Sequence, residues 1–372
     1  MSQSWNDLRN GTPRLSDEMR GRLRLPYAFR HVPEASLATL LPVPASPQPG
    51  DLAVARLEKI GKNTRFELAN GRVCGLREGD LLAVVFGNRY ATHQFEGYAL
   101  SDGPACDLLS MGGVCGLVKS RCDGVVEPSK LRLIGALGNA HGHPLNLREF
   151  AIPSVSHPNW PHVVVVCGSS MDAGKTHTAA SLIVGLQRQI EKVAAIKLTG
   201  TATGRDLWKV LDTGVCAALD FVDGGYPSTY LCSLDELVDL HRKLVAHAAA
   251  RGAEWVVIEV ADGLLQRETA ALLQSPAFTS TVDAWVFAAS DPLGALGGIW
   301  TLRRWGIAPL AISGILSMSP LASQEAQLAT GVQCITAGQL ESGMLNQRLL
   351  KATAERAGYR MAGSGPGMPP AA

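Results

Sequence analysis

The feature that most constrains the fold is a glycine-bounded loop between an apolar run and a helical pattern. His162–Gly168 has the sequence HVVVVCG, which predicts a fully buried strand. Residues 169–174 follow as Ser-Ser-Met-Asp-Ala-Gly, and a helical pattern runs from Lys175 to about Gln189. In this order the loop's backbone N–H groups can surround phosphate oxygens, and the helix N-terminus adds partial positive charge. The arrangement predicts an α/β domain with a phosphate-binding loop (P-loop).

The loop ends in Gly174-Lys175-Thr176, residue types that bind nucleotide phosphates and their metal. We expect Lys175 to bridge the β- and γ-phosphates and the Thr176 hydroxyl to ligate Mg²⁺. Asp172 either polarises a substrate proton or fixes the loop backbone. The predicted nucleotide-binding residues are Gly168, Ser169, Ser170, Met171, Asp172, Ala173, Gly174, Lys175, Thr176 and His177.

The sequence pattern changes near residues 153–162. Before it, from Asp51 to about residue 155, short runs with a period near two alternate with Gly, Asn and Asp, and Asn70-Gly71 predicts a hairpin. After it, apolar strands alternate with helices, which indicates a parallel sheet covered on both faces. We expect an N-terminal segment and Pro-rich linker (1–50), a mostly-β, barrel-like domain (51–155), a P-loop α/β domain (160–360) and a disordered tail (361–372).

Composition excludes several functional classes. The 372 residues are 46% hydrophobic and carry 34 Lys+Arg against 33 Asp+Glu, so the net charge is +1. This balance argues against a mostly disordered chain and against a nucleic-acid or anionic-membrane binder that works through bulk electrostatics. No apolar run is long enough to span a bilayer, and the N-terminus has no apolar signal core. With eight scattered cysteines and no C-x-x-C pair, we expect a cytoplasmic protein.

Charged residues at predicted strand ends are candidates for chemistry. Lys197 ends the second strand of the α/β half, at the edge where open α/β sheets bind ligands; the alternative is a surface lysine. Glu259 lies in an otherwise apolar strand, where a carboxylate is costly unless it is metal-bound or in an ion pair. Asp262 either shares the metal shell or caps the next turn. Asp206 and Asp212 either reach the metal through water or lie on a solvated helix face.

These motifs resemble the P-loop branch of dethiobiotin synthetase and the amidating cobyric acid synthases. Five residues separate Gly168 from Gly174, as in that family, where the usual P-loop has four. The segment 196–199 stands where the family has a lysine that helps bind the substrate carbamate and the transferred phosphate. The segment 258–263 resembles its Glu-Gly-Ala-Gly-Gly stretch, whose glutamate ligates Mg²⁺. The resemblance covers about 163–320, and the family's adenine-reading asparagine has no counterpart in 313–320.

One segment departs from the synthetase. The run 220–230, DFVDGGYPSTY, is similar to a segment in a sister P-loop group that includes the D-glutamate N-acetyltransferases, which use acetyl-CoA. That group's N-terminal domain is nucleotide-fold-like, whereas this one is predicted to be β. The segment is either a substrate-contacting loop or a Pro-containing turn. Predicted substrate-binding residues are Thr199, Asp223, Tyr226, Ser228 and Thr229.

Two further stretches are polar enough to contact ligands. Residues 86–96, FGNRYATHQFE, are predicted to form a second substrate site or a domain-interface loop. Residues 291–298, DPLGALGG, follow a strand, and we expect a Gly-rich loop there that contacts nucleotide or a partner.

Together these features predict an ATP- and Mg²⁺-dependent enzyme with catalytic Lys175, Lys197 and Asp172 and metal ligands Thr176, Glu259 and Asp262. The expected reaction is attack of a small molecule's carboxylate or carbamate on the γ-phosphate, as in ligases and cyclo-ligases. Three alternatives remain open: a small-molecule kinase, an N-acyltransferase that binds CoA phosphates, and a nucleotide switch or metal chaperone. The resemblance implies a homodimer, and we expect neither nucleic acid nor membrane as a partner. The sequence does not identify the substrate.

Overall fold

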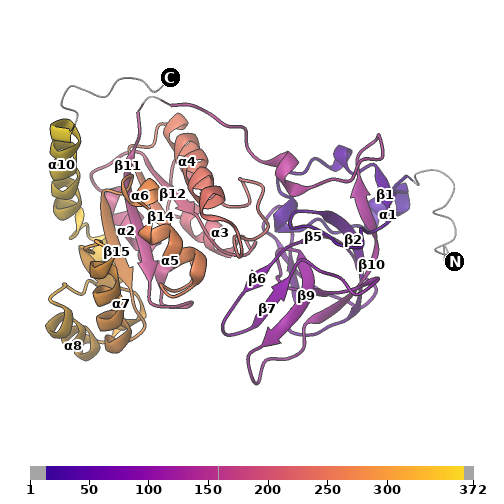
Figure 1. Cartoon of the computed structure of the whole chain (residues 1–372), viewed down its shortest axis with the longest axis horizontal. Coiled ribbons are helices and arrows are strands. Elements are labelled where there is room, and N and C mark those ends of the chain that lie inside the picture. Colours follow the sequence, from indigo (N-terminus) through magenta and orange to yellow (C-terminus); the bar gives the residue numbers. More distant parts are fainter. Residues whose placement is uncertain (1–13, 158, 364–372) are drawn as a thin grey trace. The chain divides into compact units, whose positions relative to one another are not determined.

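The computed structural model describes residues 14–157 and 159–363, with side chains through residue 355. The chain forms two compact units (Figure 1). The first contains the chain through Ser154 together with Thr199–Trp208 and Leu219–Leu244. The second contains Val155–Leu198, Lys209–Ala218 and the chain from Val245 onward. Two segments from the C-terminal half of the sequence thus belong to the same unit as the N-terminal half.

The first unit is mostly β, as predicted. Its strands are β1 (Thr39–Leu41), β2 (Leu52–Lys59), β3 (Arg65–Glu67), β4 (Val73–Gly75), β5 (Leu81–Phe86), β6 (Arg89–Tyr90), β7 (Phe95–Tyr98), β8 (Ala105–Leu108), β9 (Val114–Arg121) and β10 (Ser129–Gly138). A short helix α1 (Asp17–Arg22) and three 3₁₀ turns, Tyr27–Phe29, Glu34–Ser36 and Leu147–Phe150, accompany them. The predicted hairpin at Asn70-Gly71 is confirmed, because β3 and β4 pair antiparallel around Gly71, whose φ is 84°.

The strand pairing closes a ring, which confirms the barrel-like prediction. The main sheet has the order β1-β10-β2-β5-β9-β7-β6, and β8 pairs with both β10 and β9. The strands β10, β2, β5, β9 and β8 therefore form a closed circuit without a free edge. Apolar side chains such as Leu57, Phe66, Leu82, Phe86 and Leu131 fill its core. The hairpin of β6 and β7 extends the sheet beyond this ring.

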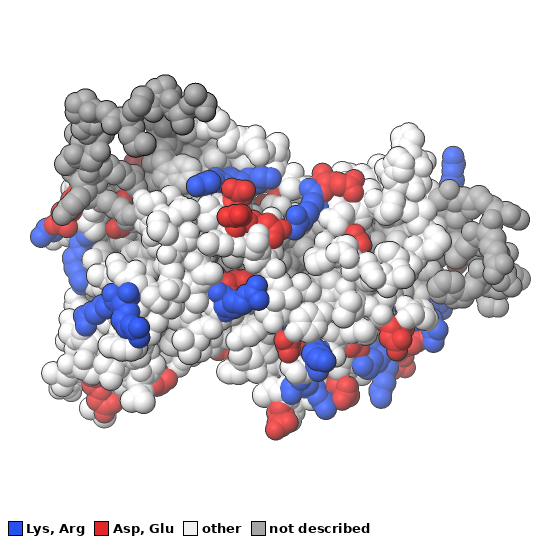
Figure 2. Space-filling view, viewed as in Figure 1, with Lys and Arg blue, Asp and Glu red and all other residues white. Residues whose placement is uncertain are grey.

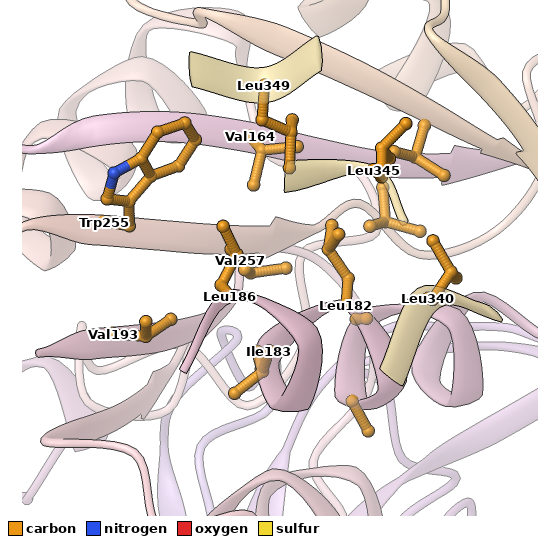
Figure 3. Packing of buried hydrophobic residues seen from close by; sticks show 14 of the residues in the cluster. Val164, Leu182, Ile183, Leu186, Val193, Trp255, Val257, Leu340, Leu345 and Leu349 are labelled. Carbon is orange, nitrogen blue, oxygen red and sulfur yellow. The ribbon is translucent and has the colours of Figure 1, made fainter. Parts of the chain in front are cut away.

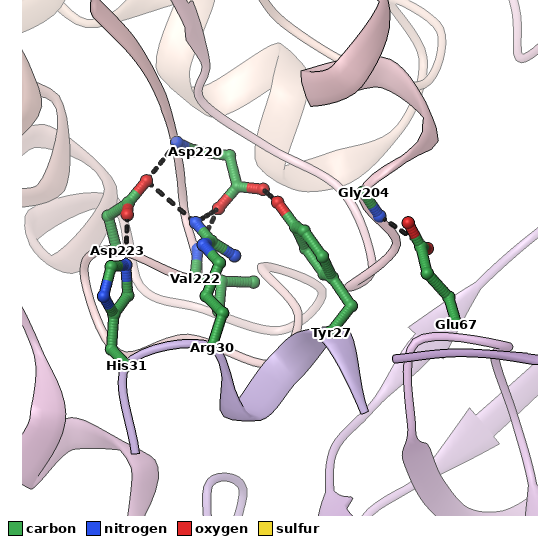
Figure 4. Close-up of polar contacts among 8 residues, drawn as sticks. All are labelled: Tyr27, Arg30, His31, Glu67, Gly204, Asp220, Val222 and Asp223. Atoms are coloured by element: carbon green, nitrogen blue, oxygen red, sulfur yellow. Dashed lines mark hydrogen bonds and ion pairs between the residues drawn. The ribbon is translucent and has the colours of Figure 1, made fainter. Parts of the chain in front are cut away.

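Buried polar contacts attach the two later segments to this unit (Figure 4). Glu67 accepts hydrogen bonds from the Gly204 N–H (2.8 Å), the Thr203 hydroxyl (3.1 Å) and the Trp208 indole (2.6 Å). Three donors satisfy a carboxylate that is only 1% exposed, so its burial is compensated without a cation.

The second set of contacts is an ion-pair cluster. Arg30 Nη2 lies 2.6 Å from Asp220 Oδ1 and 2.8 Å from Asp223 Oδ2. His31 Nε2 lies 2.5 Å from Asp223 Oδ1, and the Tyr27 hydroxyl donates to Asp220 at 2.5 Å. Burial raises the pKa of Asp223, but the hydrogen bond from His31 and the charge of Arg30 outweigh it, so the pKa falls. The carboxylate is therefore ionised and paired.

The C-terminal half alternates strands and helices. The strands are β11 (His162–Gly168), β12 (Val193–Lys197), β13 (Ala217–Asp220), β14 (Trp255–Glu259), β15 (Ala284–Ala288) and β16 (Ala311–Ser313). The helices are α2 (Lys175–Leu186), α3 (Arg205–Leu211), α4 (Leu234–Ala250), α5 (Arg267–Gln274), α6 (Pro276–Thr279), α7 (Pro292–Arg304), α8 (Pro320–Thr330), α9 (Ala337–Glu341) and α10 (Asn346–Gly363).

The order of these strands places the glycine-bounded loop at a switch point. The sheet runs β13-β12-β14-β11-β15-β16, and the pairs β11–β14, β11–β15, β12–β14 and β15–β16 are parallel. After β11 the chain continues to one side of the sheet, and after β14 it crosses to the other. Ligands of open α/β sheets bind beyond the carboxyl ends of the strands at such a reversal. Here that point is the end of β11.

An apolar core lies between one face of this sheet and α2 (Figure 3). Val164 and Val166 of β11 pack in a cluster with Leu182 and Leu186 of α2. Leu340 of α9 also belongs to it. Because successive strand residues point to opposite faces, the buried Val163 and Val165 face the other side of the sheet.

Helix α7 covers that other face at β15, and this corrects one expectation. Residues 292–298 are helical rather than a Gly-rich loop. Asp291 caps the helix by accepting from the Gly294 N–H at 2.8 Å, and Pro292 stands at its first turn, where proline is tolerated. A Cβ at Gly298 would lie 2.1 Å from Phe287 Cζ, so this glycine allows close helix–strand packing.

Three further findings concern the described chain as a whole. None of its helices is long and apolar enough to cross a membrane. Acidic and basic side chains are interspersed on the face that Figure 2 shows. Helix α10 runs through Gly363, and the remainder of the predicted tail, residues 364–372, lies outside the described residues.

Candidate phosphate-binding site

Two residues of the loop between β11 and α2 have a positive φ. Gly174 precedes α2 with a φ of 92°, a region that favours glycine. Asp172 has a φ of 62°, which is uncommon for a residue with a side chain but tolerated by Asp. Such positions are typical of functional loops, where the surrounding structure holds a backbone that is unfavourable in isolation.

Lys175 bends back over the loop that precedes it. The residue is 6% exposed, and its Nζ donates a hydrogen bond to the Ser170 carbonyl at 2.6 Å. A Cβ at Gly168 would lie 2.9 Å from Lys175 Cγ, so the lysine stem needs a glycine beneath it. Burial lowers the pKa of Lys175, and the carboxylates of Glu259 and Asp262 oppose this effect. The loop thus places one ammonium group beside its own backbone.

Two polar side chains from different elements meet at the carboxylate of Glu259. The Thr176 hydroxyl, in the first turn of α2, donates to Glu259 Oε1 at 3.0 Å. Lys197 Nζ, at the end of β12, lies 3.7 Å from the same oxygen. Parallel pairing brings them together, because Glu259 is in register with both Lys197 and Val166. The carboxylate is 6% exposed, so the lysine and the hydroxyl together offset its burial.

Asp262 lies three residues beyond Glu259 and has a perturbed acidity. Its backbone has a φ of 65°. Burial raises the pKa of Asp262 to about 6, although the charges of Lys175 and Lys197 act in the opposite direction. A carboxyl whose pKa is raised although two lysine charges oppose the shift is typical of functional sites. Its role as metal ligand or turn residue stays a prediction.

Sequence reasoning missed the neighbours that support the loop. The Ser290 hydroxyl lies 3.5 Å from that of Ser169 and 3.3 Å from that of Ser170. The Ile315 N–H donates to the Ala173 carbonyl at 3.1 Å. These contacts depend on strand register, because β15 and β16 end at the same sheet edge as β11. Ser290 lies two residues beyond the end of β15, and Ile315 lies two residues beyond the end of β16.

The other predicted ligand residues of this half are partly or fully exposed. Asp172 is exposed, and Met171 is partly exposed. His177 is exposed, and its Nδ1 lies 3.2 Å from Lys209 Nζ. Asp206 lies in the first turn of α3, and Asp212 is exposed just beyond its end.

The predicted substrate-binding residues belong to the first unit. Thr229 accepts a hydrogen bond from the Gly200 N–H at 2.8 Å, and Ser228 forms a β-bridge with Thr201. Tyr226 lies under the Arg148 guanidinium, 4.9 Å from ring centroid to Cζ, and burial raises the pKa of Tyr226 to about 12.

Their contacts are structural in the described chain. The carboxylate of Asp223 is held by Arg30 and His31, and Thr199 is 3% exposed. A direct substrate contact for these residues stays a prediction.

The described residues contain no group of three or more His, Cys, Asp or Glu side chains placed to hold a metal ion. Thr176 and Glu259 nevertheless offer two oxygen donors at one point. Mg²⁺ is usually held by one or two carboxylates together with substrate phosphates and waters. The residues present fit such a partial site.

Known proteins resemble this chain only weakly. No protein-family model matches the chain, and no curated protein matches it. Solved structures match over part of the length. One is the signal recognition particle 54 kDa protein from Aeropyrum pernix K1 in complex with GDP, which shares 16% identity with this chain at a TM-score of 0.35. The match covers 58% of this chain and 55% of that chain. The signal recognition particle receptor FtsY from Elizabethkingia anophelis in complex with GDP shares 14% identity at a TM-score of 0.36. The match covers 52% of this chain and 62% of that chain.

A third match is the hydrogenase maturation factor HypB from Archaeoglobus fulgidus, with 16% identity and a TM-score of 0.34 over 51% of this chain and 90% of that chain. This chain covers less than two thirds of the first two structures. At this similarity the P-loop α/β assignment rests on the strand order, the loop backbone and the residues Lys175 and Thr176. The resemblance to dethiobiotin synthetase stays a prediction.

Proposed function

We propose that this protein is an ATP- and Mg²⁺-dependent enzyme that activates the carboxylate or carbamate of a small molecule by γ-phosphoryl transfer. The observation that supports this most is the meeting of Thr176, Glu259 and Lys197 at the end of β11. Nucleotide binding alone needs the loop and Lys175. A second lysine at the carboxyl end of the neighbouring β12 favours transfer of the phosphoryl group to a second, anionic substrate.

In the proposed reaction, a carboxylate oxygen of the substrate attacks the γ-phosphorus, and the bond between that phosphorus and the bridging oxygen breaks. ADP leaves, and an acyl phosphate forms. An internal or external nucleophile then attacks the acyl carbon and releases inorganic phosphate. Lys175 and Lys197 would neutralise the charge on the phosphoryl group and orient the two substrates. No side chain has to form a covalent bond.

The loop residues have separate tasks in this scheme. Backbone N–H groups of 169–174 would bind the phosphates, and Thr176 and Glu259 would hold Mg²⁺, which supplies charge neutralisation on the phosphate oxygens. Lys175 would exchange its hydrogen bond with the Ser170 carbonyl for one with phosphate oxygens. Asp172, exposed at the loop tip, is proposed to act on a substrate proton.

Hydroxylamine trapping tests the reaction class. The protein is incubated with Mg·ATP, hydroxylamine and pools of small carboxylic acids, and ADP and hydroxamate are measured. An acyl phosphate intermediate gives equimolar ADP and hydroxamate. Lys197→Met, which removes the second ammonium group, should lower this yield at least tenfold and leave Mg·ATP binding within about threefold. A stable phosphorylated product without hydroxamate would instead identify a kinase.

One alternative has its own supporting observation. The segment 220–230 resembles the acetyl-CoA-using group, and its Asp223 is held in a fixed position by Arg30 and His31. In an N-acyltransferase the loop would bind the phosphates of CoA. Calorimetric titration with ATP, GTP, CTP and acetyl-CoA separates the two: tight acetyl-CoA binding without a nucleotide response would replace our proposal. Binding of a nucleotide that is hydrolysed slowly, with no acceptor, would indicate a switch.

The assembly and location of the protein are part of the proposal. Exposed apolar side chains Leu293, Leu296 and Trp300 follow one face of α7, as expected of a surface that another chain covers. We propose a homodimer, and light scattering at several concentrations measures its mass. All eight cysteines are free thiols, in keeping with the cytoplasmic location that we propose.

A further inference from the structure

The hairpin of β6 and β7 contains an arginine whose charge is not offset. Arg89, in β6, donates from Nη2 to Gln94 Oε1 at 2.7 Å, and its guanidinium carbon lies 5.8 Å from the centre of the Phe95 ring. Its other terminal nitrogen, Nη1, is buried and has no hydrogen-bond partner among the described residues. No carboxylate within the described ranges forms an ion pair with it.

Arg30, a second buried arginine, shows how unusual it is that Arg89 has no carboxylate partner among the residues that the structure describes. Arg30 also has a buried Nη1 without a partner in the part of the chain that the structure covers. Its Nη2, however, contacts two carboxylates, Asp220 and Asp223. Burial alone would lower the pKa of Arg30, but Asp220 and Asp223 raise it above its usual range. Arg89 has only the first effect: burial lowers its pKa to about 10.

A buried cation without a partner is destabilising, whereas an anion bound to it offsets much of that penalty. A guanidinium is also the side chain best suited to bind a planar carboxylate or a phosphate through parallel N–H groups. Gln94 accepts from Arg89 through its oxygen, so its amide nitrogen supplies a further donor from the same pair of side chains.

The pairing of β6 with β7 places Arg89 and Glu96 on opposite faces of the hairpin. In its register Arg89 is opposite Gly97, and a Cβ at Gly97 would lie 2.9 Å from Leu109 Cδ2. The opposite face of the hairpin has Glu96, which accepts hydrogen bonds from Tyr98 at 2.6 Å and from Ser120 at 2.9 Å. The acidic group is therefore directed away from the arginine and engaged by other donors.

We infer that Arg89 and Gln94 form an oxyanion-binding site in the first unit, separate from the phosphate loop, for a small carboxylate or phosphate. Arg89 as a whole residue is partly exposed although its Nη1 is buried, and β6 is at the edge of its sheet. The site does not depend on nucleotide binding. It fits the polar stretch 86–96 that the sequence marks as a candidate second substrate site.

The test uses the full-length chain and two probes, succinate and inorganic phosphate, with sodium chloride at equal ionic strength as the reference. Thermal unfolding gives the apparent Kd of each probe for wild type, Arg89→Met and Arg89→Lys. We expect a probe-dependent rise in Tm for wild type, at least a tenfold weaker apparent Kd for Arg89→Met, and an intermediate loss for Arg89→Lys.

The same substitution at the other buried arginine is the matched control. In chloride alone, Arg89→Met should raise Tm, because it removes an uncompensated buried charge. Arg30→Met should lower Tm, because it leaves Asp220 and Asp223 unpaired. A purely structural role for Arg89 predicts a fall for both variants.

Phosphate also binds phosphate loops, so Lys175→Ala separates the two sites. A succinate or phosphate response that survives in Lys175→Ala and disappears in Arg89→Met supports the inference, and its relative size for the two probes shows which oxyanion the site prefers. The inference is wrong if wild type responds to neither probe, or if Arg89→Met responds as wild type does. If Arg89→Met does not fold, equal responses of wild type and Arg89→Lys would overturn it.

Discussion

Glu259 shows how much a single residue can reveal before the structure is known. A carboxylate within an apolar strand needs a partner, which predicts a metal or an ion pair, and its oxygen lies 3.0 Å from Thr176 Oγ1 and 3.7 Å from Lys197 Nζ. The residue types and their place at strand ends predicted this convergence. The contacts of Ser290 and Ile315 with the loop were beyond prediction, because they depend on which strands are neighbours.

The hydroxyl of Thr176 is the residue-scale test of the metal site. Thr176→Val keeps the side-chain shape and removes one oxygen donor, so Mg·ATP binding should weaken about tenfold or more. Binding of ATP in EDTA should change little. Thr176→Ser, which keeps the hydroxyl, is the control and should bind within about threefold of wild type. Equal Mg²⁺ dependence in wild type and Thr176→Val would contradict the assignment.

At the scale of elements, segments with a clear hydrophobic period were predictable, whereas short segments interrupted by glycine and proline were not. The runs at 162–168 and 255–259 form β11 and β14 as expected. The glycines of 291–298 suggested a loop, yet Asp291 and Pro292 begin α7 there. Tertiary packing overrides the low helix propensity of glycine here, because Gly298 is required where the helix contacts Phe287.

Two adjacent glycines of α7 test this explanation. A Cβ at Gly297 would have none of the described atoms within 4 Å, whereas a Cβ at Gly298 would lie 2.1 Å from Phe287 Cζ. Gly297→Ala should raise the free energy of unfolding by about 0.5–1 kcal/mol, because alanine is the better helix former. Gly298→Ala should lower it by about 1–3 kcal/mol through overpacking. Denaturant unfolding measures both, and effects of equal sign would refute the packing argument.

His241 of α4 makes a pH-dependent contribution to stability. Burial lowers the pKa of His241 from 6.5 to about 3, with Arg242 adding to the effect. As the pH falls below about 6.5, His241 becomes protonated in the unfolded chain but stays neutral in the folded chain. The free energy of unfolding therefore decreases until the pH reaches about 3. The slope from this group is at most about 1.4 kcal/mol per pH unit. Between pH 7 and 4.5, denaturant unfolding should show a smaller loss for His241→Leu than for wild type; parallel curves would contradict this.

At the scale of the whole molecule, the sequence predicted two kinds of architecture but not their interleaving. The change from period-two runs to strand–helix alternation is visible in the residues themselves. The return of residues 199–208 and 219–244 to the first unit is not visible in the sequence. It depends on contacts between distant residues, such as Glu67 with Trp208 and Arg30 with Asp220.

This interleaving predicts the behaviour of fragments. A chain of residues 1–154 lacks the partners of Tyr27, Arg30, His31 and Glu67, so it should not unfold cooperatively on its own. Thermal unfolding and amide hydrogen exchange of the purified fragment measure this. A cooperative transition with the exchange protection of the full-length protein would show that the two later segments are dispensable.

The central claim is that the loop 168–176 binds a nucleoside triphosphate through Lys175. Isothermal titration calorimetry of the full-length protein with Mg·ATP, and with GTP and acetyl-CoA for comparison, tests it most directly. Our account predicts saturable Mg·ATP binding by wild type and at least tenfold weaker binding by Lys175→Ala, with the variant's Tm close to wild type. Unchanged Mg·ATP affinity in Lys175→Ala, or binding of neither ATP nor GTP by wild type, would contradict it.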